Sequence, residues 1–406
     1  MSSLPADVQE LKFRDPKRAA ALSAALARLA ADLPGPITLM HVCGSHEQAI
    51  ARYGLRSALP DGIRVSMGPG CPVCVTDMPE VDEAVALVRQ GIHVATYGDM
   101  LRVPGSRMSL MDARAEGGQV HVVYGIEQAV DVARRTDAEV VFFATGFETT
   151  AVTTASALLR TPPPNFSVLS AHKFILPAME IVVQVPGTAI AGFIAAGHAA
   201  TITGSAIFEP FADRYRQPVV VAGFEPLDIL AALLRLVELV RDGEPRVVNM
   251  FPRCVTPQGN LRAQAQLWQV FELTSGHWRG IAEIPGGNMR LRPEWAHYDA
   301  RRRFTIDLTL LRDGLPPSLV EQCVCGRIMT GLASPVNCPL FGDTCTPEMP
   351  VGACMVSSEG ACRIWHEYGE HEGHEGYKGR EEHKRHKEYK EYEARSGHGA
   401  DAGARS

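Results

Sequence analysis

The chain has 406 residues, of which 46% are hydrophobic and 21% are charged, an ordinary composition for a globular protein of two or three domains. Its formal net charge of -6 provides no basic excess that would attract nucleic acid or an acidic membrane surface. The N-terminal segment lacks the basic start and apolar core of a secretory signal, so we expect a cytoplasmic protein.

From about Pro36 onward, apolar β-rich runs alternate with helical patterns. The first set has strands at ITLMHV, IRVSM and HVATYG, with helices from about residue 46 and after residue 78. The second set has strands at EVVFFAT, FSVLSA, AIAGFIA and PVVVAGF, with helices at 149–159, ILPAMEIVVQ and LDILAALLRLVELV. This rhythm predicts parallel sheets with crossover helices, and we expect two α/β domains, residues 1–130 and 131–318.

Residues 189–208 contain no charged side chain and reach membrane-spanning length. The stretch is rich in Gly, Ala and Thr and carries His198, whereas a spanning helix needs a more strongly apolar run. We therefore predict buried α/β core here.

The last third of the chain changes character. RVVNMF and a helical stretch to about Leu273 complete one of the two domains, and a loop-rich connector is expected beyond Gly276. Residues 319–365 are poor in apolar periodicity and rich in cysteine, which predicts a small domain stabilised by metal. Residues 366–406 are charged and almost free of aliphatic side chains, which predicts disorder. This tail carries six histidines, typical either of nickel or zinc binding or of a solvated charged segment: His366, His371, His374, His383, His386 and His398.

Ten cysteines in a reducing compartment favour metal or redox roles over structural disulfides. Six of them lie within forty residues: Cys323, Cys325, Cys338, Cys345, Cys354 and Cys362. Zinc would favour paired Cys-x-x-Cys knuckles, which do not occur in this segment, whereas iron-sulfur clusters accept thiolates from scattered loops. We therefore expect four cysteines to bind a 4Fe-4S cluster and the other two to form a redox-active pair. Zinc or structural thiols are the alternatives.

Two further cysteine motifs follow predicted strands. Cys71-Pro72-Val73-Cys74 opens toward a helix, as redox or metal-binding pairs do, although two small residues buried in a tight turn would give the same pattern. Cys43 is followed by Gly44, Ser45 and His46, and the alternative here is one buried cysteine beside a helix-capping serine. If both strands belong to one sheet, three thiols face one cleft and, with His46, could bind low-valent iron.

The motif Thr145-Gly146-Phe147-Glu148-Thr149-Thr150 also lies between a strand and a helix, but no Gly-Lys-Ser/Thr follows, so it is not a Walker A loop. Helix capping by Thr149 or Thr150 and anion binding at the helix N-terminus are both compatible with it. His172, Lys173 and His198 lie near predicted strand ends and either line the same cleft or are structural.

The segments VCGSHE, GPGCPVC, TGFETT and CPLFGDTCTPEMPVGACMVSSEGAC together resemble the HypD family of nickel-iron hydrogenase maturation proteins, over about residues 15–368. The resemblance implies partners, the small chaperone HypC and the cyanide donor HypE, and the joint assembly of an iron fragment with two cyanides and one carbon monoxide. The sequence departs from the family pattern at Gln48, Ala191 and Ala196, and the histidine-rich tail is not a usual family feature.

The resemblance also implies residue roles. Cys43 corresponds to the iron-contacting cysteine, beside His46, and Cys71 with Cys74 to a redox-active pair near that iron. The implied cluster ligands are Cys323, Cys338, Cys345 and Cys362, and the implied redox pair is Cys325 with Cys354. The main hypothesis is therefore a scaffold for assembling the Fe(CN)2CO fragment, with electrons from a 4Fe-4S cluster. The alternatives are an iron-sulfur-dependent thiol-disulfide oxidoreductase acting on a partner protein and a zinc-stabilised binding module.

Overall fold

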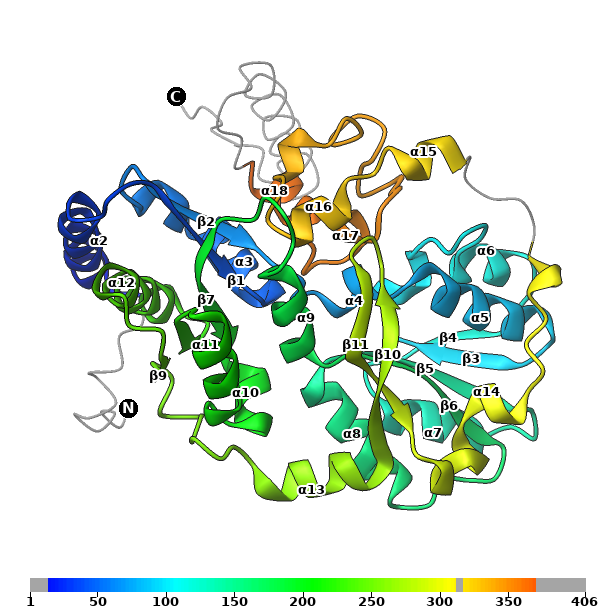
Figure 1. Ribbon diagram of the computed structural model, residues 1–406. Helices are drawn as coiled ribbons and strands as arrows, with labels where there is room; N and C mark the ends of the chain where they lie inside the picture. The colour runs from blue at the N-terminus through cyan, green and yellow to red at the C-terminus, as the bar shows by residue number, and fades with distance from the viewer. Residues whose placement is uncertain (1–13, 312–316, 370–406) are drawn as a thin grey trace, which may run out of the picture. The chain divides into compact units, whose positions relative to one another are not determined.

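The computed structural model describes residues 14–311 and 317–369. Two parallel sheets, a long antiparallel hairpin and a C-terminal segment of short helices make up this part of the chain (Figure 1). The fold is therefore α/β with parallel sheets, as the strand and helix rhythm predicts.

The first sheet has the strand order β2-β1-β7-β8-β9. Its strands are β1 (Ile37–His41), β2 (Ile63–Met67), β7 (Ile190–Ala196), β8 (Val219–Ala222) and β9 (Val247–Asn249). The chain leaves β1 toward β2 on one side and later adds β7 on the other. Ligand sites of open α/β sheets lie at such a reversal, outside the carboxyl ends of the strands. In this sheet the reversal lies between β1 and β7.

The second sheet has the order β4-β3-β5-β6 and a reversal between β3 and β5. Its strands are β3 (His93–Thr96), β4 (Val120–Val122), β5 (Val140–Gly146) and β6 (Phe166–His172). Every residue of β5 and β6 is buried, as expected for central parallel strands covered on both faces.

The sheets do not follow the expected division of the chain at residue 130. β1 and β2 pair with strands that come after residue 189, while the strands between residues 93 and 172 form the second sheet. Continuous apolar runs predict that a strand is buried, but they carry no information about which strand lies beside it.

Helices cover both sheets. The α-helices are α2 (Pro16–Ala31), α3 (Gly44–Arg52), α4 (Pro72–Val75), α5 (Met78–Arg89), α6 (Leu110–Ala115), α7 (Ile126–Arg134), α8 (Glu148–Leu158), α9 (Ile175–Val182), α10 (Gly197–Thr203), α11 (Glu209–Tyr215), α12 (Pro226–Asp242), α13 (Leu261–Val270), α14 (Ala300–Arg303), α15 (Pro317–Glu321), α16 (Cys325–Met329), α17 (Ala353–Val356) and α18 (Ala361–Tyr368). The short 3₁₀ helices are η1 (Leu55–Ala58), η2 (Asp99–Arg102), η3 (Ala206–Phe208), η4 (Pro293–Tyr298), η5 (Leu308–Leu310) and η6 (Pro335–Asn337).

Successive side chains of a strand point to opposite faces of the sheet and so join different parts of the core. In β1, Leu39 packs with Leu26 of α2 and Leu233 of α12 on one face, while Met40 faces the larger core on the other. Each such leucine contributes about 1.5–3 kcal/mol through removal of its apolar surface from water. No helix within the described residues is long and apolar enough to cross a membrane. The uncharged stretch 189–208 forms β7, α10 and η3.

The connector predicted to be loop-rich is instead an antiparallel hairpin of β10 (Phe271–Trp278) and β11 (Ala282–Leu291). Four glycines, at 276, 280, 286 and 287, interrupt the apolar alternation that would have identified the strands. Gly276 adjoins an irregularity in the pairing register, and Gly280 has a positive φ of 69° in the turn. The sequence prediction was therefore wrong for this segment.

The C-terminal segment consists of short helices joined by turns, as expected for residues 319–365. Its buried residues, among them Ile328, Met329 and Met355, share one apolar cluster with Val75 and Val81 of the α/β part. The predicted disordered tail begins too early, because α18 extends to Tyr368 and includes His366. The other five tail histidines lie outside the described residues.

Candidate functional site

Cys43 lies at the reversal of the first sheet. It lies two residues beyond the end of β1 and immediately precedes α3, and its side chain is 1% exposed. Its Sγ is 3.9 Å from Nδ1 of His198, which belongs to α10 just after β7. The two strands that flank the reversal thus bring a thiol and an imidazole together, and the predicted position of His198 in this cleft agrees with the structure.

Burial dominates the electrostatics of this pair. It raises the pKa of Cys43 to about 12 and lowers the pKa of His198. Both groups are therefore neutral at pH 7, and the thiol can donate to the imidazole. A buried thiolate at Cys43 requires a compensating positive charge, which a coordinated metal ion would provide.

His46 lies one turn into α3 and is also buried. Its Nε2 donates to the carbonyl of Gly223 at 2.9 Å, and its ring stacks on Phe224 with 4.9 Å between centroids. Burial lowers the pKa of His46 to about 3, so the ring is neutral. Phe224 also contacts the ring of His198. The phenyl ring therefore separates the two imidazoles beside Cys43.

Glu47 connects α3 to the C-terminal segment. Its buried carboxylate accepts hydrogen bonds from His41 at 2.7 Å, from Arg56 at 2.7 and 2.9 Å, and from the indole of Trp365 at 2.7 Å. Burial alone would raise the pKa of Glu47, but the charge of Arg56 and the hydrogen bond from His41 hold it below the usual range. Sequence reasoning did not identify this network, because its link to the C-terminal segment runs through Trp365, which is far from Glu47 in the chain.

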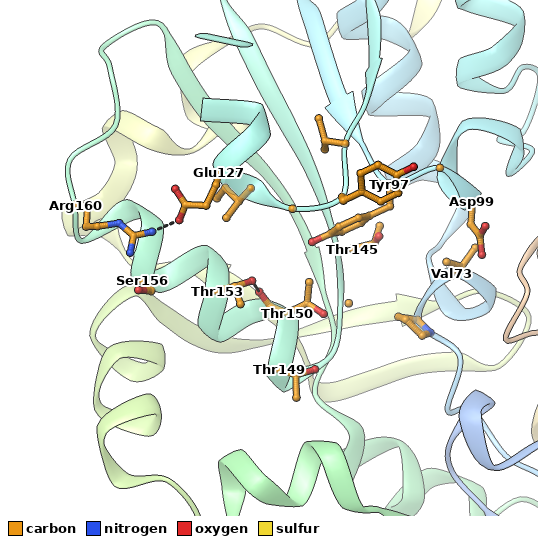
Figure 2. Close-up of a pocket in the computed structure, with 17 residues that line it drawn as sticks. Val73, Tyr97, Asp99, Glu127, Thr145, Thr149, Thr150, Thr153, Ser156 and Arg160 are labelled. Carbon is orange, nitrogen blue, oxygen red and sulfur yellow. Dashed lines mark hydrogen bonds and ion pairs between the residues drawn. The ribbon is translucent and has the colours of Figure 1, made fainter. Parts of the chain in front are cut away.

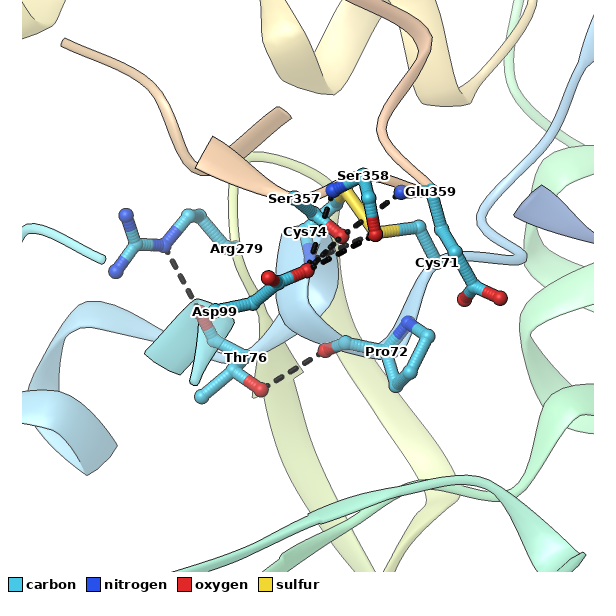
Figure 3. The surroundings of a disulfide bond; sticks show 9 residues. All are labelled: Cys71, Pro72, Cys74, Thr76, Asp99, Arg279, Ser357, Ser358 and Glu359. Carbon is cyan, nitrogen blue, oxygen red and sulfur yellow. Dashed lines mark hydrogen bonds between the residues drawn. A yellow bond between two sulfur atoms is a disulfide. The ribbon is translucent and has the colours of Figure 1, made fainter. Parts of the chain in front are cut away.

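Cys71 and Cys74 form a disulfide, and both side chains are fully buried (Figure 3). Cys71 is the N-cap of α4, and its Sγ accepts a hydrogen bond from the Cys74 backbone at 3.2 Å. The motif therefore turns into a helix as expected. Its loop also touches the Cys43 loop, since Gly44 N donates to Gly70 O at 3.2 Å and a Cβ at Gly70 would lie 2.1 Å from Cys43 N.

A cavity of about 340 Å³ lies in front of these loops. One wall comes from the first sheet and the C-terminal segment, and the other from the TGFETT motif at the start of α8. Its lining residues are Ser45, Gly70, Pro72, Phe147, Thr149, Thr150, His198, Phe224 and Glu359. The cavity therefore adjoins Cys43 and the disulfide, because Pro72 lies between the two disulfide cysteines and His198 contacts Cys43.

Residues of the TGFETT motif line this cavity. The expected side-chain capping of α8 by this motif does not occur. Phe147 precedes α8 and makes no side-chain cap, while Thr149 and Thr150 lie inside the first turn. A larger cavity of about 890 Å³ lies at the reversal of the second sheet and shares Pro72, Thr149 and Thr150 with the smaller one (Figure 2). Tyr97 lines the larger cavity at the end of β3, a position that the strand-end rule could have indicated.

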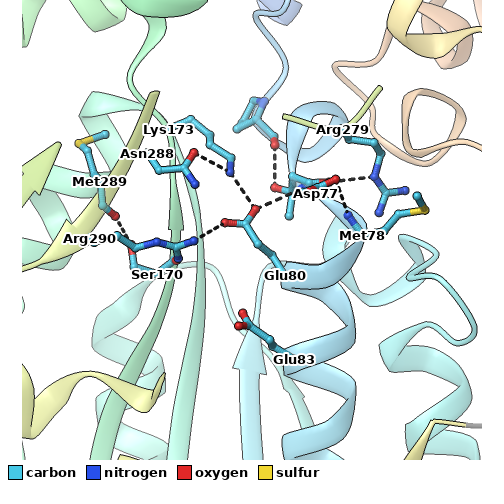
Figure 4. A network of polar contacts seen from close by, with 12 residues as sticks. Asp77, Met78, Glu80, Glu83, Ser170, Lys173, Arg279, Asn288, Met289 and Arg290 are labelled. Carbon is cyan, nitrogen blue, oxygen red and sulfur yellow. Dashed lines mark hydrogen bonds and ion pairs between the residues drawn. The ribbon is translucent and has the colours of Figure 1, made fainter. Parts of the chain in front are cut away.

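His172 and Lys173 are structural, which corrects the suggestion that they line the cleft. The ring of His172 is hydrogen-bonded to Thr154 at 2.9 Å. Lys173 is fully buried, and its Nζ donates to Glu80 at 2.8 Å and to Asn288 at 3.0 Å (Figure 4). Both side chains turn into the core from the end of β6.

The C-terminal thiols gather beside α4. Sγ of Cys323 is 3.1 Å from Sγ of Cys325, and Cys354 shares hydrogen bonds with both Cys325 and Cys362. These bonds lower the pKa of Cys354 to about 5, while hydrogen bonds with Cys325 and Cys354 raise the pKa of Cys362 well above its usual value. Sγ of Cys345 accepts a hydrogen bond from a backbone amide, and Cys338 is half-buried.

Among the described residues, no group of three or more His, Cys, Asp or Glu side chains is placed to hold one metal ion. A 4Fe-4S cluster, however, takes one thiolate at each of its four irons, so its ligands need not meet at a point. The six cysteines supply the soft donors that such a cluster requires. The donor set therefore fits the expected cofactor.

Segment 357–360 connects these thiols with the first site. Ser357 and Ser358 bind Asp99 of η2 (Figure 3). Ser45 of α3 donates to Glu359 at 3.1 Å. α17, which carries Cys354, also packs on α4, which carries Cys74. The two cysteine sites, which lie far apart in the sequence, are thus neighbours in the fold.

An α/β fold with a buried disulfide at one sheet edge, and a thiol-rich segment packed against it, defines a protein built around cysteine chemistry. The HypD family model, described as the hydrogenase formation hypA family, matches residues 17–369. The chain belongs to this family.

The sequence similarity to known relatives extends along nearly the whole chain. The chain is 43% identical over 375 residues to the hydrogenase maturation factor HypD of Rhizobium leguminosarum bv. viciae, covering 88% of this chain and 96% of the relative. It is 44% identical over 370 residues to the same factor of Azotobacter vinelandii, with the same coverage of both. The factor of Rhodobacter capsulatus is 40% identical over 368 residues, covering 88% of this chain and 97% of that protein.

Proposed function

We propose that this protein is a maturation factor for nickel-iron hydrogenase that serves, with a HypC-type chaperone and a HypE-type cyanide donor, as the scaffold on which the Fe(CN)2CO fragment is assembled. The observation that carries the proposal is the position of Cys43, a buried thiol beside His198, in loop contact with the Cys71–Cys74 disulfide and next to a cavity. Membership of a family of hydrogenase maturation factors supports the same role.

The iron under assembly is cargo, and Cys43 would hold it. Thiolate is a soft ligand suited to low-valent iron with cyanide and carbon monoxide, which accept electron density from the metal. His46 and His198 are neutral and flank Phe224, so they add no positive charge that would repel the iron. The HypC-type partner would reach the iron through the cavity lined by Ser45, Gly70 and Phe147.

Cys71 and Cys74 would serve as the redox pair next to the cargo. Reduction of their disulfide consumes two electrons and two protons and gives two thiols, which could then also contact the iron. Cys71 lies at the N-terminus of α4, and its sulfur accepts a hydrogen bond from the Cys74 backbone N–H, a donor that would also stabilise a thiolate formed on reduction.

The resident cofactor in this proposal is a 4Fe-4S cluster held by Cys323, Cys338, Cys345 and Cys362. Such a cluster stores and supplies single electrons. Cys325 and Cys354 form the second thiol pair, and Cys354 lies in the helix that packs on α4. The cysteine-rich segment therefore places its thiols beside the disulfide that requires electrons.

Replacement of Cys43 tests the scaffold. In anaerobically purified complex with its partners, Cys43→Ala should abolish the infrared bands of iron-bound cyanide and carbon monoxide, because the iron loses its thiolate ligand. The cluster absorbance should stay at the wild-type level, since Cys43 is outside the C-terminal thiol group. Cys254→Ala is the matched control, because Cys254 is an exposed free thiol elsewhere in the chain. Retention of the bands in Cys43→Ala would refute the assignment.

The second candidate is a thiol-disulfide oxidoreductase, which the Cys71–Cys74 disulfide beside a thiol cluster favours. Steady reduction of a protein disulfide in the absence of a HypC-type partner would support it. Both sulfur atoms are fully buried, however, so a partner thiol cannot reach them in this conformation. A zinc-stabilised binding module is distinguished by analysis of the anaerobic protein, since one 4Fe-4S cluster gives a brown protein with about four irons and four sulfides.

A further inference from the structure

Arg279 is a buried cation in the turn of the β10–β11 hairpin. Its side chain is 8% exposed. Nε donates to the carbonyl of Thr76 at 2.8 Å (Figure 3). Nη2 donates to Pro104 O at 2.6 Å, and the backbone N–H donates to Val75 O at 3.1 Å. The hairpin thus inserts a guanidinium at the C-terminal end of the disulfide-bearing helix α4.

The hydrogen-bond partners of Arg279 are neutral carbonyls, and among the described residues it forms no ion pair with a carboxylate. A buried charge without a nearby counter-charge is unfavourable by several kcal/mol in real proteins. Burial lowers the pKa of Arg279, and this effect is opposed by the charge of Asp77 and then by Cys325, Cys323 and Cys354 when these are thiolates. The charges that offset this burial therefore come from Asp77, which precedes α5, and from the C-terminal thiol site.

The contact between the hairpin turn and the thiol site is close. A Cβ at Gly326 would lie 1.7 Å from the carbonyl oxygen of Gly280, so the two backbones touch. Gly280 directly follows Arg279, and Gly326 directly follows Cys325. Glycine at both positions allows the turn to approach the first residue of α16. Arg279 therefore lies where α4 and the cysteine-rich segment meet.

We propose that Arg279 is the fixed counter-charge of the C-terminal thiol site and makes this site easier to reduce. The inference rests on the proposed function in one respect, that the site holds a 4Fe-4S cluster. Each one-electron reduction adds a negative charge, and a buried guanidinium nearby stabilises the more negative state. Net charge and solvent exposure are among the factors that set cluster potentials. Arg279 would act on the cluster through its charge and not by contact with the reacting atoms, so it is a positioning residue.

The test is the midpoint potential of the cluster in the full-length protein, measured by an anaerobic titration with dithionite and redox mediators and followed by electron paramagnetic resonance. Arg279→Gln should lower the equilibrium constant for reduction about tenfold, which is a shift of 59 mV to more negative potential for a one-electron couple. Arg279→Lys keeps the charge and should stay within about twofold of the wild type.

Arg292→Gln is the matched control. Arg292 follows the opposite end of the same hairpin, and its Nε also donates to backbone carbonyls, those of Trp268 and Phe271. Its removal changes the net charge equally, but away from the thiols, and should leave the midpoint unchanged. If the loss of any one positive charge had the same effect, the midpoint potential would shift equally in Arg279→Gln and Arg292→Gln. This result would overturn the proposal.

The outcomes separate the two hypotheses. A wild-type protein without a cluster signal contradicts the cofactor of the proposed function. A cluster with an unchanged midpoint in Arg279→Gln overturns the role of Arg279 and leaves the cofactor standing. If Arg279→Gln does not assemble, Arg279→Lys decides, because it retains the charge but alters the carbonyl hydrogen bonds. A tenfold shift in Arg279→Lys would show that these bonds, and not the charge, control the potential.

Discussion

Glu148 is a buried carboxyl group without a charged partner. One of its oxygens accepts a hydrogen bond from Ile175 N at 3.0 Å, while the other has no partner within the described part of the chain. Burial raises the pKa of Glu148 to about 7, against an ordinary value of 4.5. The group lies in the TGFETT motif between two residues that line the cavity, Phe147 and Thr149. The protonation state of Glu148 therefore affects the stability of this wall of the cavity.

Glu148→Gln should remove a pH dependence of stability. Between pH 4.5 and 7 the folded wild type holds a proton that the unfolded chain releases, so its free energy of unfolding falls as pH rises through this window. At pH 8 the loss is about 3 kcal/mol, since each unit of pKa displacement is about 1.4 kcal/mol. Urea unfolding at pH 5 and pH 8 should show a larger decrease for the wild type than for Glu148→Gln. Equal decreases would contradict a buried, protonated Glu148.

At the residue scale, the sequence predicted the positions of reactive side chains best where these residues lie just after a strand. Cys43 and the Cys71/Cys74 motif lie at strand ends, and the strand-end rule placed them at one sheet edge. Arg279 and Trp365 could not be found in this way, because their roles arise from contacts with residues far away in the chain. Lys173 follows a strand but turns inward to Glu80, and strand position alone does not give side-chain direction.

At the scale of elements, Gly70 controls how closely the disulfide loop approaches β1. A Cβ there would lie 2.0 Å from Val42 C and 2.1 Å from Cys43 N, and real Cβ atoms do not approach backbone this closely. Alanine at Gly70 must therefore move one of the two loops. The Gly44 N to Gly70 O hydrogen bond, which joins them, would be broken or lengthened.

Gly70→Ala should lower the free energy of unfolding by about 1–3 kcal/mol, the usual effect of overpacking, and should reduce retention of iron at Cys43. The first effect is measured by urea unfolding and the second by the cyanide and carbon monoxide bands of the anaerobic complex. Gly125→Ala is the matched control, because a Cβ at Gly125 meets no atom within 4 Å. Wild-type behaviour of Gly70→Ala in both measurements would show that this contact is not required.

At the scale of the whole molecule, the rhythm of strands and helices predicted the parallel sheets but not their strand order. The runs that form β1 and β2 look the same in composition as those of the second sheet, and partner choice depends on packing across hundreds of residues. The sequence also placed the cysteine groups at opposite ends of the chain. Their proximity comes from segment 357–360, which belongs to the cysteine-rich motif, but the motif alone does not reveal its contacts with Asp99 and Ser45.

Asp99 holds this segment beside the disulfide. One carboxylate oxygen accepts hydrogen bonds from Ser357 Oγ at 3.2 Å, Ser358 N at 3.1 Å and Ser358 Oγ at 3.4 Å. Hydrogen bonds to a charged acceptor contribute about 1.5–3 kcal/mol each when buried, and less for partly exposed donors such as Ser358. Their loss should permit segment 357–360 to move away from Cys71 and Cys74.

Asp99→Ala should therefore speed reduction of the Cys71–Cys74 disulfide by a small phosphine about tenfold, because about 1.4 kcal/mol of the cost of local opening is removed. The rate is followed by alkylation and mass spectrometry of the two cysteines. Asp137→Ala, a change at an exposed residue before β5, is the control and should react like the wild type. Equal rates for Asp99→Ala and the control would mean that the segment does not shield the disulfide, and that electrons reach it without movement of the C-terminal segment.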